Sequence, residues 1–99
     1  MLFMLYLTIS CNKDDGQSDG ITSLCFKYEF GVKYVYVYIN NSDAYDASFD
    51  LPHATTVDGA SQNHTYHFYN IVTGSMGEVV SFSATVDGKV YSYPKDKCQ

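Results

Sequence analysis

Apolar and polar side chains alternate along much of the chain, and the alternation is most regular over residues 33–40. Successive side chains of a β-strand point to opposite faces of the sheet, so this segment predicts a strand with one aliphatic and one aromatic face. We expect the aliphatic face to point into a core and the aromatic face to line the other side. The two faces consist of Val35, Val37 and Ile39 on one side and Tyr34, Tyr36 and Tyr38 on the other.

The same kind of pattern predicts further short strands. The chain contains ten tyrosines and six phenylalanines, and aromatic and β-branched residues favour a pleated, half-buried surface. No long stretch combines helical apolar spacing with a capped start. We therefore expect an all-β protein. The other segments that we expect to form strands are 22–29, 47–51, 65–71, 78–86 and 89–93.

Turn residues separate these segments. Asp87-Gly88 predicts a type I′ hairpin turn, because both central residues of that turn need positive φ. Within the small, polar stretch 54–63, Asp58-Gly59 predicts a second turn. The remaining breaks are Pro52, the glycine-rich corner 73–77 and Pro94.

Six or seven short strands with turns between them are typical of a two-sheet, immunoglobulin-like sandwich. The run 66–71, the glycine corner and the run 80–84 are together similar to fibronectin type III and related bacterial immunoglobulin-like modules. That similarity implies a small β-sandwich. The alternative is a small open β-barrel.

The first nine residues are almost wholly apolar and are followed by Ser10 and Cys11. A membrane-spanning helix needs about 20 apolar residues, whereas a run of half that length is the size of a signal-peptide core. The segment resembles a bacterial lipoprotein signal, with Cys11 as the lipidated residue of a lipobox. The following run, Asn12 to Asp15, is similar to that of Bacteroidota-type surface lipoproteins, in which an acidic stretch accompanies export to the cell surface.

This resemblance implies a signal peptide at residues 1–10 and a protein held at the outer membrane or cell surface by a lipid anchor. Residues 12–20 contain no apolar side chain, so we expect 11–20 to form a flexible tether. The folded domain then covers 21–99. The alternatives are that the first residues form a buried β-strand or an uncleaved anchor.

The chain carries six basic and eleven acidic residues, giving a formal net charge of −5. Nucleic-acid binding needs clustered Lys and Arg, so we expect no nucleic-acid partner. With Cys11 lipidated, Cys25 and Cys98 remain near the two ends of the domain, and an exported protein permits a disulfide between them. Closing so long a loop contributes about 4 kcal/mol by the chain-entropy relation. The alternative is two free thiols.

A row of tyrosines on an exposed sheet face offers broad, rigid contact area with hydroxyl groups, a surface that suits a sugar or a protein partner. The alternative is ordinary cross-strand packing. The acidic loop 40–50 follows the row directly. The candidate binding face consists of Tyr34, Tyr36, Tyr38, Asp43, Tyr45 and Asp46.

Catalytic and metal-binding patterns are weak in this sequence. His64 and His67 are three residues apart, which places them on opposite faces of a strand. The carboxylates of loop 40–50 could gather around calcium, but they lack the spacing and glycine of an EF-hand loop. There is no nucleophile elbow and no phosphate-cradling loop. We expect no metal, no cofactor and no catalysis.

The sequence thus predicts a non-enzymatic surface lipoprotein that acts as a binding or accessory module for a glycan or a protein. Two other functions remain open: a small lipoprotein inhibitor of an enzyme, and a structural spacer or assembly subunit that accepts another chain at a free strand edge.

Overall fold

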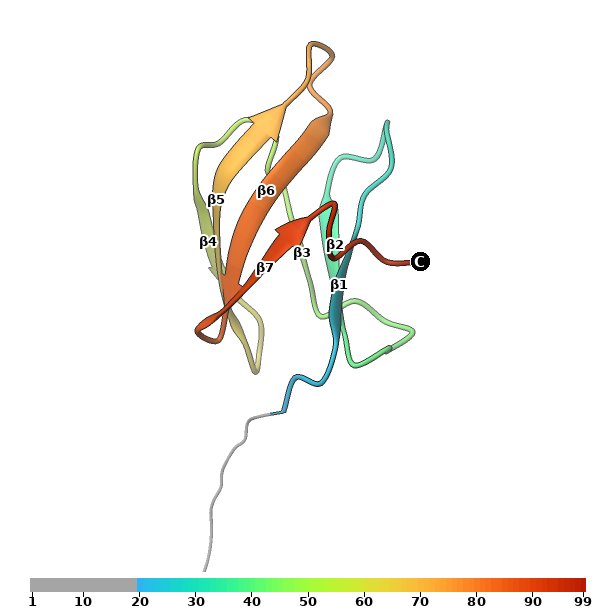
Figure 1. The fold of residues 1–99 in the computed structure, drawn as a ribbon, viewed down its shortest axis with the longest axis vertical. Helices are drawn as coiled ribbons and strands as arrows, with labels where there is room; N and C mark the ends of the chain where they lie inside the picture. Colours follow the sequence, from blue (N-terminus) through green and yellow to red (C-terminus); the bar gives the residue numbers. More distant parts are fainter. Residues whose placement is uncertain (1–19) are drawn as a thin grey trace, which may run out of the picture.

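The computed structural model describes residues 20–99, so the expected signal peptide (1–10), Cys11 and nearly all of the tether lie outside the described part. Seven strands form two antiparallel sheets that face each other (Figure 1). Within residues 20–99 there is no helix with the length and apolar character that a membrane crossing requires. The first sheet contains β1 (Leu24–Lys27), β2 (Val35–Ile39) and β3 (Ala47–Phe49). The second contains β4 (Val57–Ala60), β5 (Thr65–Thr73), β6 (Val79–Val86) and β7 (Lys89–Tyr93).

The all-β, two-sheet sandwich is confirmed, and the sheets do not close into the alternative barrel. In each sheet every strand pairs with its neighbours in sequence, in the orders β1-β2-β3 and β4-β5-β6-β7. The connection from β3 to β4 carries the chain from the first sheet to the second. Antiparallel neighbours need only short connections, and residues with positive φ lie in four of them: β1–β2, β2–β3, β5–β6 and β6–β7.

The core lies between the sheets and is built around three phenylalanines. Phe26 on β1 meets Phe82 on β6 edge-on, with ring centroids 4.9 Å apart, and Phe68 on β5 lies 6.2 Å from Phe26 and 5.4 Å from Phe82. Val35 and Val37 of β2 are completely buried beside them, as the alternation predicts. Interdigitating rings from both inner faces are how a sandwich buries apolar area, the main stabilising contribution to folding.

The β6–β7 hairpin confirms the predicted turn, since Asp87 and Gly88 have φ values of 49° and 83°. The turn predicted at Asp58-Gly59 is wrong, because both residues lie inside the edge strand β4. Gly59 is required there for close packing: a Cβ at this position would lie 2.5 Å from Cε1 of Phe49. Glycine in a strand can mark such a close approach as well as a bend.

The C-terminal residues return to the first sheet and run beside β1. The backbone N–H of Phe26 donates to the carbonyl of Asp96 (2.9 Å), and the N–H of Cys98 donates to the carbonyl of Phe26 (2.8 Å). Lys97 forms a parallel bridge with Phe26, and Cys25 and Cys98 form the expected disulfide across 73 residues of sequence. The outer edge of β1 is therefore covered by the chain's own C-terminal segment.

Candidate functional site

Three tyrosines form an aromatic cluster on the outer face of the first sheet. The ring of Tyr45 lies edge-on to Tyr36, at 4.9 Å and 64°, and to Tyr38, at 6.4 Å and 72°. Tyr36 and Tyr38 project from β2 away from the core, and Tyr45 comes from the loop that follows. Tyr45 is 47% exposed. We call Tyr36, Tyr38 and Tyr45 the tyrosine cluster.

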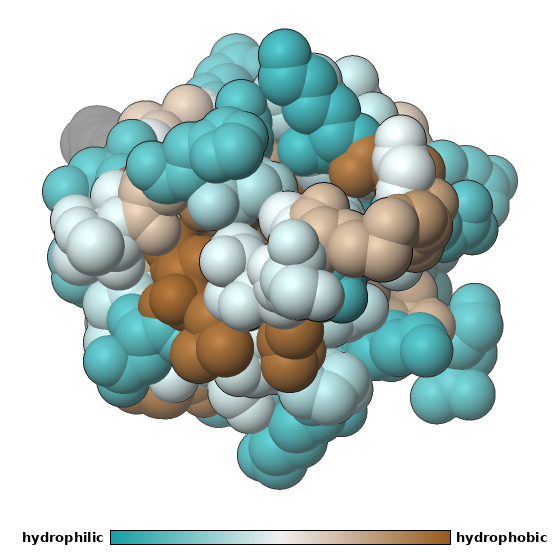
Figure 2. Space-filling model, turned by 90° about the horizontal axis from the view of Figure 1, so that it is seen from above, coloured by the Kyte–Doolittle hydropathy of each residue, from teal (hydrophilic) through white to brown (hydrophobic). Residues whose placement is uncertain are grey.

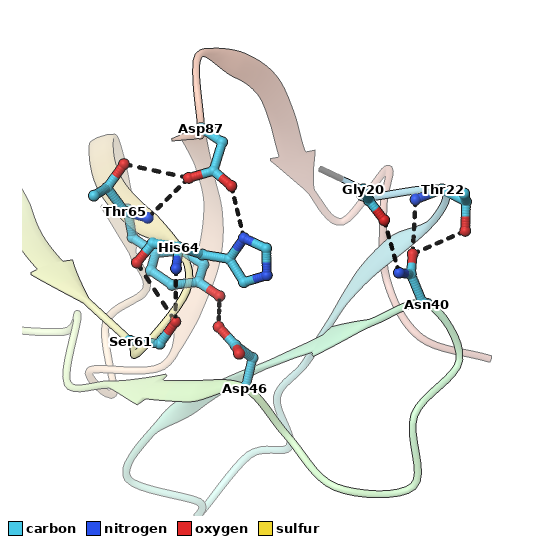
Figure 3. A network of polar contacts seen from close by, with 9 residues as sticks. Gly20, Thr22, Asn40, Asp46, Ser61, His64, Thr65 and Asp87 are labelled. Atoms are coloured by element: carbon cyan, nitrogen blue, oxygen red, sulfur yellow. Dashed lines mark hydrogen bonds and ion pairs between the residues drawn. The ribbon is translucent and has the colours of Figure 1, made fainter. Parts of the chain in front are cut away.

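The loop that carries Tyr45 is held by its own polar side chains. Asn40 and Asn41 both adopt positive φ, 55° and 59°, which turns the chain sharply after β2. The Oδ1 atom of Asn40 accepts hydrogen bonds from the N–H and the hydroxyl of Thr22, and its Nδ2 donates to the carbonyl of Gly20 at 2.9 Å (Figure 3). The same oxygen also accepts a hydrogen bond from the N–H of Ser23. These bonds fasten the start of the domain to the loop.

Asp46, which was expected on the binding face, instead joins the loop to the second sheet. Its N–H donates to the carbonyl of Val37 (2.7 Å), which closes the loop, and its carboxylate accepts a short hydrogen bond from the hydroxyl of Tyr66 (Figure 3). Burial, reinforced by this bond and the carboxylate charge, raises the pKa of Tyr66 far above its usual value. Tyr66 therefore remains a neutral donor, and Asp46 fixes the position of the loop.

Tyr34 lies outside the tyrosine cluster. It precedes β2, and the ammonium group of Lys33 lies 5.7 Å from the centroid of its ring. The sequence predicted a continuous row of three tyrosines along one strand. In the structure the third ring beside Tyr36 and Tyr38 is that of Tyr45 and not that of Tyr34. Tyr34 is still 37% exposed, so it serves as an exposed tyrosine for comparison.

Two adjoining depressions surround the cluster. The smaller has a volume of about 300 Å³, and the tyrosine cluster lines it together with Lys27, Tyr28, Glu29 and Val32. The larger has a volume of about 860 Å³ and shares Lys27, Tyr28, Glu29 and Tyr38 with the smaller. Its other walls are formed by the loop residues around Asp43, by the disulfide and by the C-terminal segment 95–99. We call the two depressions together the groove.

Pairing in the first sheet explains which side chains meet in the groove. Lys27 lies opposite Tyr36 and Cys25 lies opposite Tyr38, so all four project from the same outer face. Tyr28, which lines both depressions, is bonded to the second sheet, because the Tyr28 hydroxyl accepts a hydrogen bond from the N–H of Val79 at 3.2 Å. The groove therefore rests on paired strands and is bordered by a hydrogen-bonded loop and a disulfide-linked segment.

Of the charged side chains that line the groove, sequence reasoning identified Asp43 and missed Lys27, Glu29, Lys95, Asp96 and Lys97. A signal for them was available. The expected disulfide between Cys25 and Cys98 already implied that the lysines next to Cys98 lie beside those of the first strand.

Two of the three histidines, His64 and His67, form separate pairs with aspartates beside the second sheet. Nδ1 of His64 lies 2.6 Å from Oδ2 of Asp87, and Nδ1 of His67 lies 2.5 Å from Oδ1 of Asp58. Burial alone would raise the pKa of Asp87, but hydrogen bonds from His64 and from the backbone of Thr65 outweigh it and lower that pKa.

Ser61, His64 and Asp87 lie close together but do not form a hydrolytic relay. The hydroxyl of Ser61 accepts a hydrogen bond from the backbone N–H of His64 at 3.1 Å instead of contacting the imidazole (Figure 3). A serine nucleophile needs its hydroxyl on the ring nitrogen that takes the proton. Within residues 20–99, no three His, Cys, Asp or Glu side chains are placed to share a metal ion.

A second exposed region lies at the end of the molecule that carries the β5–β6 turn. Phe30 is 67% exposed and Met76 is 74% exposed, and a depression of about 290 Å³ lies between their loops. Viewed from this end, the apolar side chains lie in groups that are separated by side chains of intermediate hydropathy (Figure 2).

No protein-family model matches this chain, and no match was found among the curated proteins or the solved structures.

Proposed function

We propose that this protein is a non-enzymatic binding module, displayed at the cell surface by a lipid on Cys11, and that it binds a glycan on the tyrosine cluster. The observation that carries the proposal is the position of the cluster. Three aromatic rings lie on an outer sheet face and line the groove, whose two depressions have volumes of about 860 Å³ and about 300 Å³. Concave sites of this size are typical of ligand-binding sites.

The cluster is not needed to fill the core. The interior is occupied by the three phenylalanines and the buried valines, and the tyrosines stand on the opposite face of the same strands. Tyrosine offers a flat apolar ring for the face of a sugar and a hydroxyl for its polar edge, and it loses little conformational entropy on binding. Edge-on packing by Tyr45 holds the other two rings in place before a ligand arrives.

The arrangement favours a glycan over a strand-adding peptide. A peptide that extends a sheet needs free backbone groups along an edge. Both the N–H and the carbonyl of Phe26 on β1 are already bonded to the C-terminal segment. The groups that line the groove are side-chain hydroxyls, carboxylates and ammonium groups, which match the hydroxyls of a sugar.

The proposed anchor and the groove are compatible in space. The coloured trace begins at Gly20, at the lower end of the view in Figure 1, and Asn40 fastens Gly20 to the loop that carries Tyr45. A tether from Cys11 would therefore join the domain beside that loop. Mass spectrometry of the protein from membranes tests the anchor: a diacyl or triacyl mass on Cys11 supports it, and an intact Met1 in membrane-free protein excludes it.

Glycan binding is tested with the full chain on an array of oligosaccharides, followed by calorimetric titration of the best ligand. The triple variant Y36A/Y38A/Y45A should lose at least tenfold in affinity, since stacked aromatic side chains are frequent energetic hot spots. The matched control is Tyr34→Ala, which removes an exposed tyrosine outside the cluster and should bind like the parent. The proposal fails if the parent binds no glycan, or if the triple variant, folded by circular dichroism, binds equally well.

A second candidate function is inhibition of an enzyme by the loop after β2. The loop protrudes from the domain (Figure 1) and is fastened at both ends by the side chains of Asn40 and Asp46. A rigid loop loses little entropy when it enters a cleft. Recovery of one protein partner with the parent but not with a variant of Asp43 and Ala44, in the absence of glycan binding, would favour this function.

A further inference from the structure

The two depressions of the groove carry equal numbers of positive and negative side chains. One ammonium group and one carboxylate, those of Lys27 and Glu29, line the smaller depression. The larger depression contains the same two groups and adds two of each sign, so three ammonium groups and three carboxylates line it. The added side chains are Asp43, Lys95, Asp96 and Lys97. Charge is therefore balanced in each depression separately, although the chain as a whole has a formal net charge of −5.

The charged groups of the groove form no ion pairs with one another. Between residues 20 and 99 the ion pairs are the two histidine–aspartate contacts beside the second sheet, and none of their four residues lines the groove. Asp96 accepts a hydrogen bond from the N–H of Ser92 at 2.9 Å, and this bond leaves the charge of Asp96 in place. Ammonium groups and carboxylates thus line the same walls and remain available to a ligand.

Sugar hydroxyls suit such a surface, because a hydroxyl is both a donor and an acceptor. It donates a hydrogen bond to a carboxylate and accepts one from an ammonium group, and hydrogen bonds with one charged partner are stronger than those between neutral groups. A charged ligand gains from wall groups of one sign, but it is placed beside equally many groups of its own sign, and like charges in an interface are costly. Balanced walls therefore favour a ligand that has many hydroxyls and no charge.

The two depressions adjoin at Tyr38, which lines both of them. On one side of Tyr38 the larger depression extends to the loop at Asp43 and to the C-terminal segment 95–99. On the other side the smaller depression extends to Tyr36 and Tyr45. A sugar ring that stacks on the tyrosine cluster therefore occupies the smaller depression, and the rings that follow it in a chain reach the larger one.

From the charge balance and the joined depressions we propose that the ligand of the groove is an uncharged oligosaccharide that occupies both depressions. One ring stacks on the tyrosine cluster. Hydroxyls of this ring and of the next bind Lys27 and Glu29 where the depressions adjoin, and hydroxyls farther along the chain bind Asp43. This proposal deepens the proposed function and rests on it. Affinity should rise with chain length until both depressions are filled.

The first test measures binding of the full chain to three sets of oligosaccharides of increasing length at low salt. The neutral set contains linear glucan, galactan, mannan and chitin oligomers, the acidic set contains oligogalacturonates and sulfated galactan oligomers, and the basic set contains chitosan oligomers. The tightest ligand should come from the neutral set and bind about tenfold more tightly than any charged oligomer. Because this ligand has no charge, about 1 M NaCl should change its affinity less than about twofold.

Charge variants test whether the balance itself excludes charged ligands. Glu29→Gln leaves one ammonium group in excess, so it should raise the affinity for oligogalacturonate about threefold to fivefold, the gain expected for one partly solvated charge pair. Lys27→Gln leaves one carboxylate in excess and should raise the affinity for chitosan oligomers by a similar factor. The double variant K27Q/E29Q restores the balance and should bind both probes as weakly as the parent. The matched control is Asp58→Asn, which makes the same change in net charge as Glu29→Gln but on the second sheet, and should leave oligogalacturonate binding unchanged.

The outcomes separate the two proposals. If an acidic or basic oligomer binds as tightly as the best neutral one, and the triple tyrosine variant abolishes that binding, the glycan site stands and the uncharged assignment is overturned. Unchanged binding of the charged probes by Glu29→Gln and by Lys27→Gln also overturns it, because charge balance would then not be what excludes them. Equal affinity for the shortest and the longest neutral oligomers overturns the occupation of both depressions. If no oligosaccharide binds, both proposals fall.

Discussion

Replacing Gly59 by alanine should destabilise the domain through a single contact. An added Cβ would lie 2.5 Å from Cε1 of Phe49, closer than such atoms are found in proteins, and 3.3 Å from its Cζ. Phe49 cannot move freely, because its ring packs 5.1 Å from that of Tyr66 and 4.8 Å from that of Phe68. The substitution must therefore shift either the ring or strand β4.

Two opposing effects determine how much Gly59→Ala changes the free energy of unfolding. Overpacking of this kind costs about 1–3 kcal/mol. Gly→Ala also restricts the unfolded chain, which stabilises the folded state by about 0.4–1 kcal/mol. We expect a net loss of about 1–2 kcal/mol in the free energy of unfolding. In a domain of this size each lost kcal/mol lowers Tm by about 4–8 °C.

A double-mutant cycle assigns this loss to the ring. Phe49→Leu removes the Cε1 and Cζ atoms but leaves a side chain that reaches about as far as Cδ1, which lies at an ordinary 3.4 Å from the added Cβ. Gly59→Ala should then cost little or nothing in the Phe49→Leu background. Urea unfolding of the four proteins measures the cycle. Equal losses in both backgrounds, or no loss in the parent, would refute the close-approach explanation.

Two further predictions concern the disulfide and the Asp87 pair. Replacing Cys25 and Cys98 by serine should lower the free energy of unfolding by about 2–5 kcal/mol, measured by urea titration; an unchanged midpoint would show that the cross-link does not limit the unfolded chain. The lowered pKa of Asp87 means that its stabilising contribution is present above the carboxyl's unfolded pKa and is lost as the pH falls through the folded value. Asp87→Asn should therefore flatten the fall of Tm with acidification below about pH 4, and an identical profile would contradict the role given to His64 and Thr65.

Alternation along the chain was sufficient to predict most of the fold. The buried Val35 and Val37 and the outward Tyr36 and Tyr38 occupy the faces that a period of two assigns them. The Asp87 turn follows from the same local chemistry, because positive φ is a property of the turn itself.

The turn predicted at Gly59 was wrong because glycine occurs in two different structural situations. Glycine permits a turn, but it also permits another side chain to lie against the backbone, and only the tertiary contact with Phe49 separates the two. Local sequence around Asp58 gives no sign of that contact, since Phe49 belongs to a strand of the other sheet.

The binding surface was predictable only in part, because it too depends on contacts between residues far apart in sequence. Tyr36 and Tyr38 follow from the strand, but the return of the loop places Tyr45 beside them, and this depends on the hydrogen bonds of Asn40 and Asp46. Lys97 lines the groove because the C-terminal segment runs from β7 in the second sheet to the edge of β1 in the first. Contacts between residues far apart in sequence have no periodic signature.

The central claim, that ligand binds on the outer face of the first sheet, is tested most directly by mapping amide chemical shifts of the full chain during titration with the best oligosaccharide ligand from the array. The largest changes should fall on β1, β2, the loop around Tyr45 and the C-terminal residues beside Cys98. Changes confined to the second sheet or to the turns that carry Phe30 and Met76 would contradict the claim.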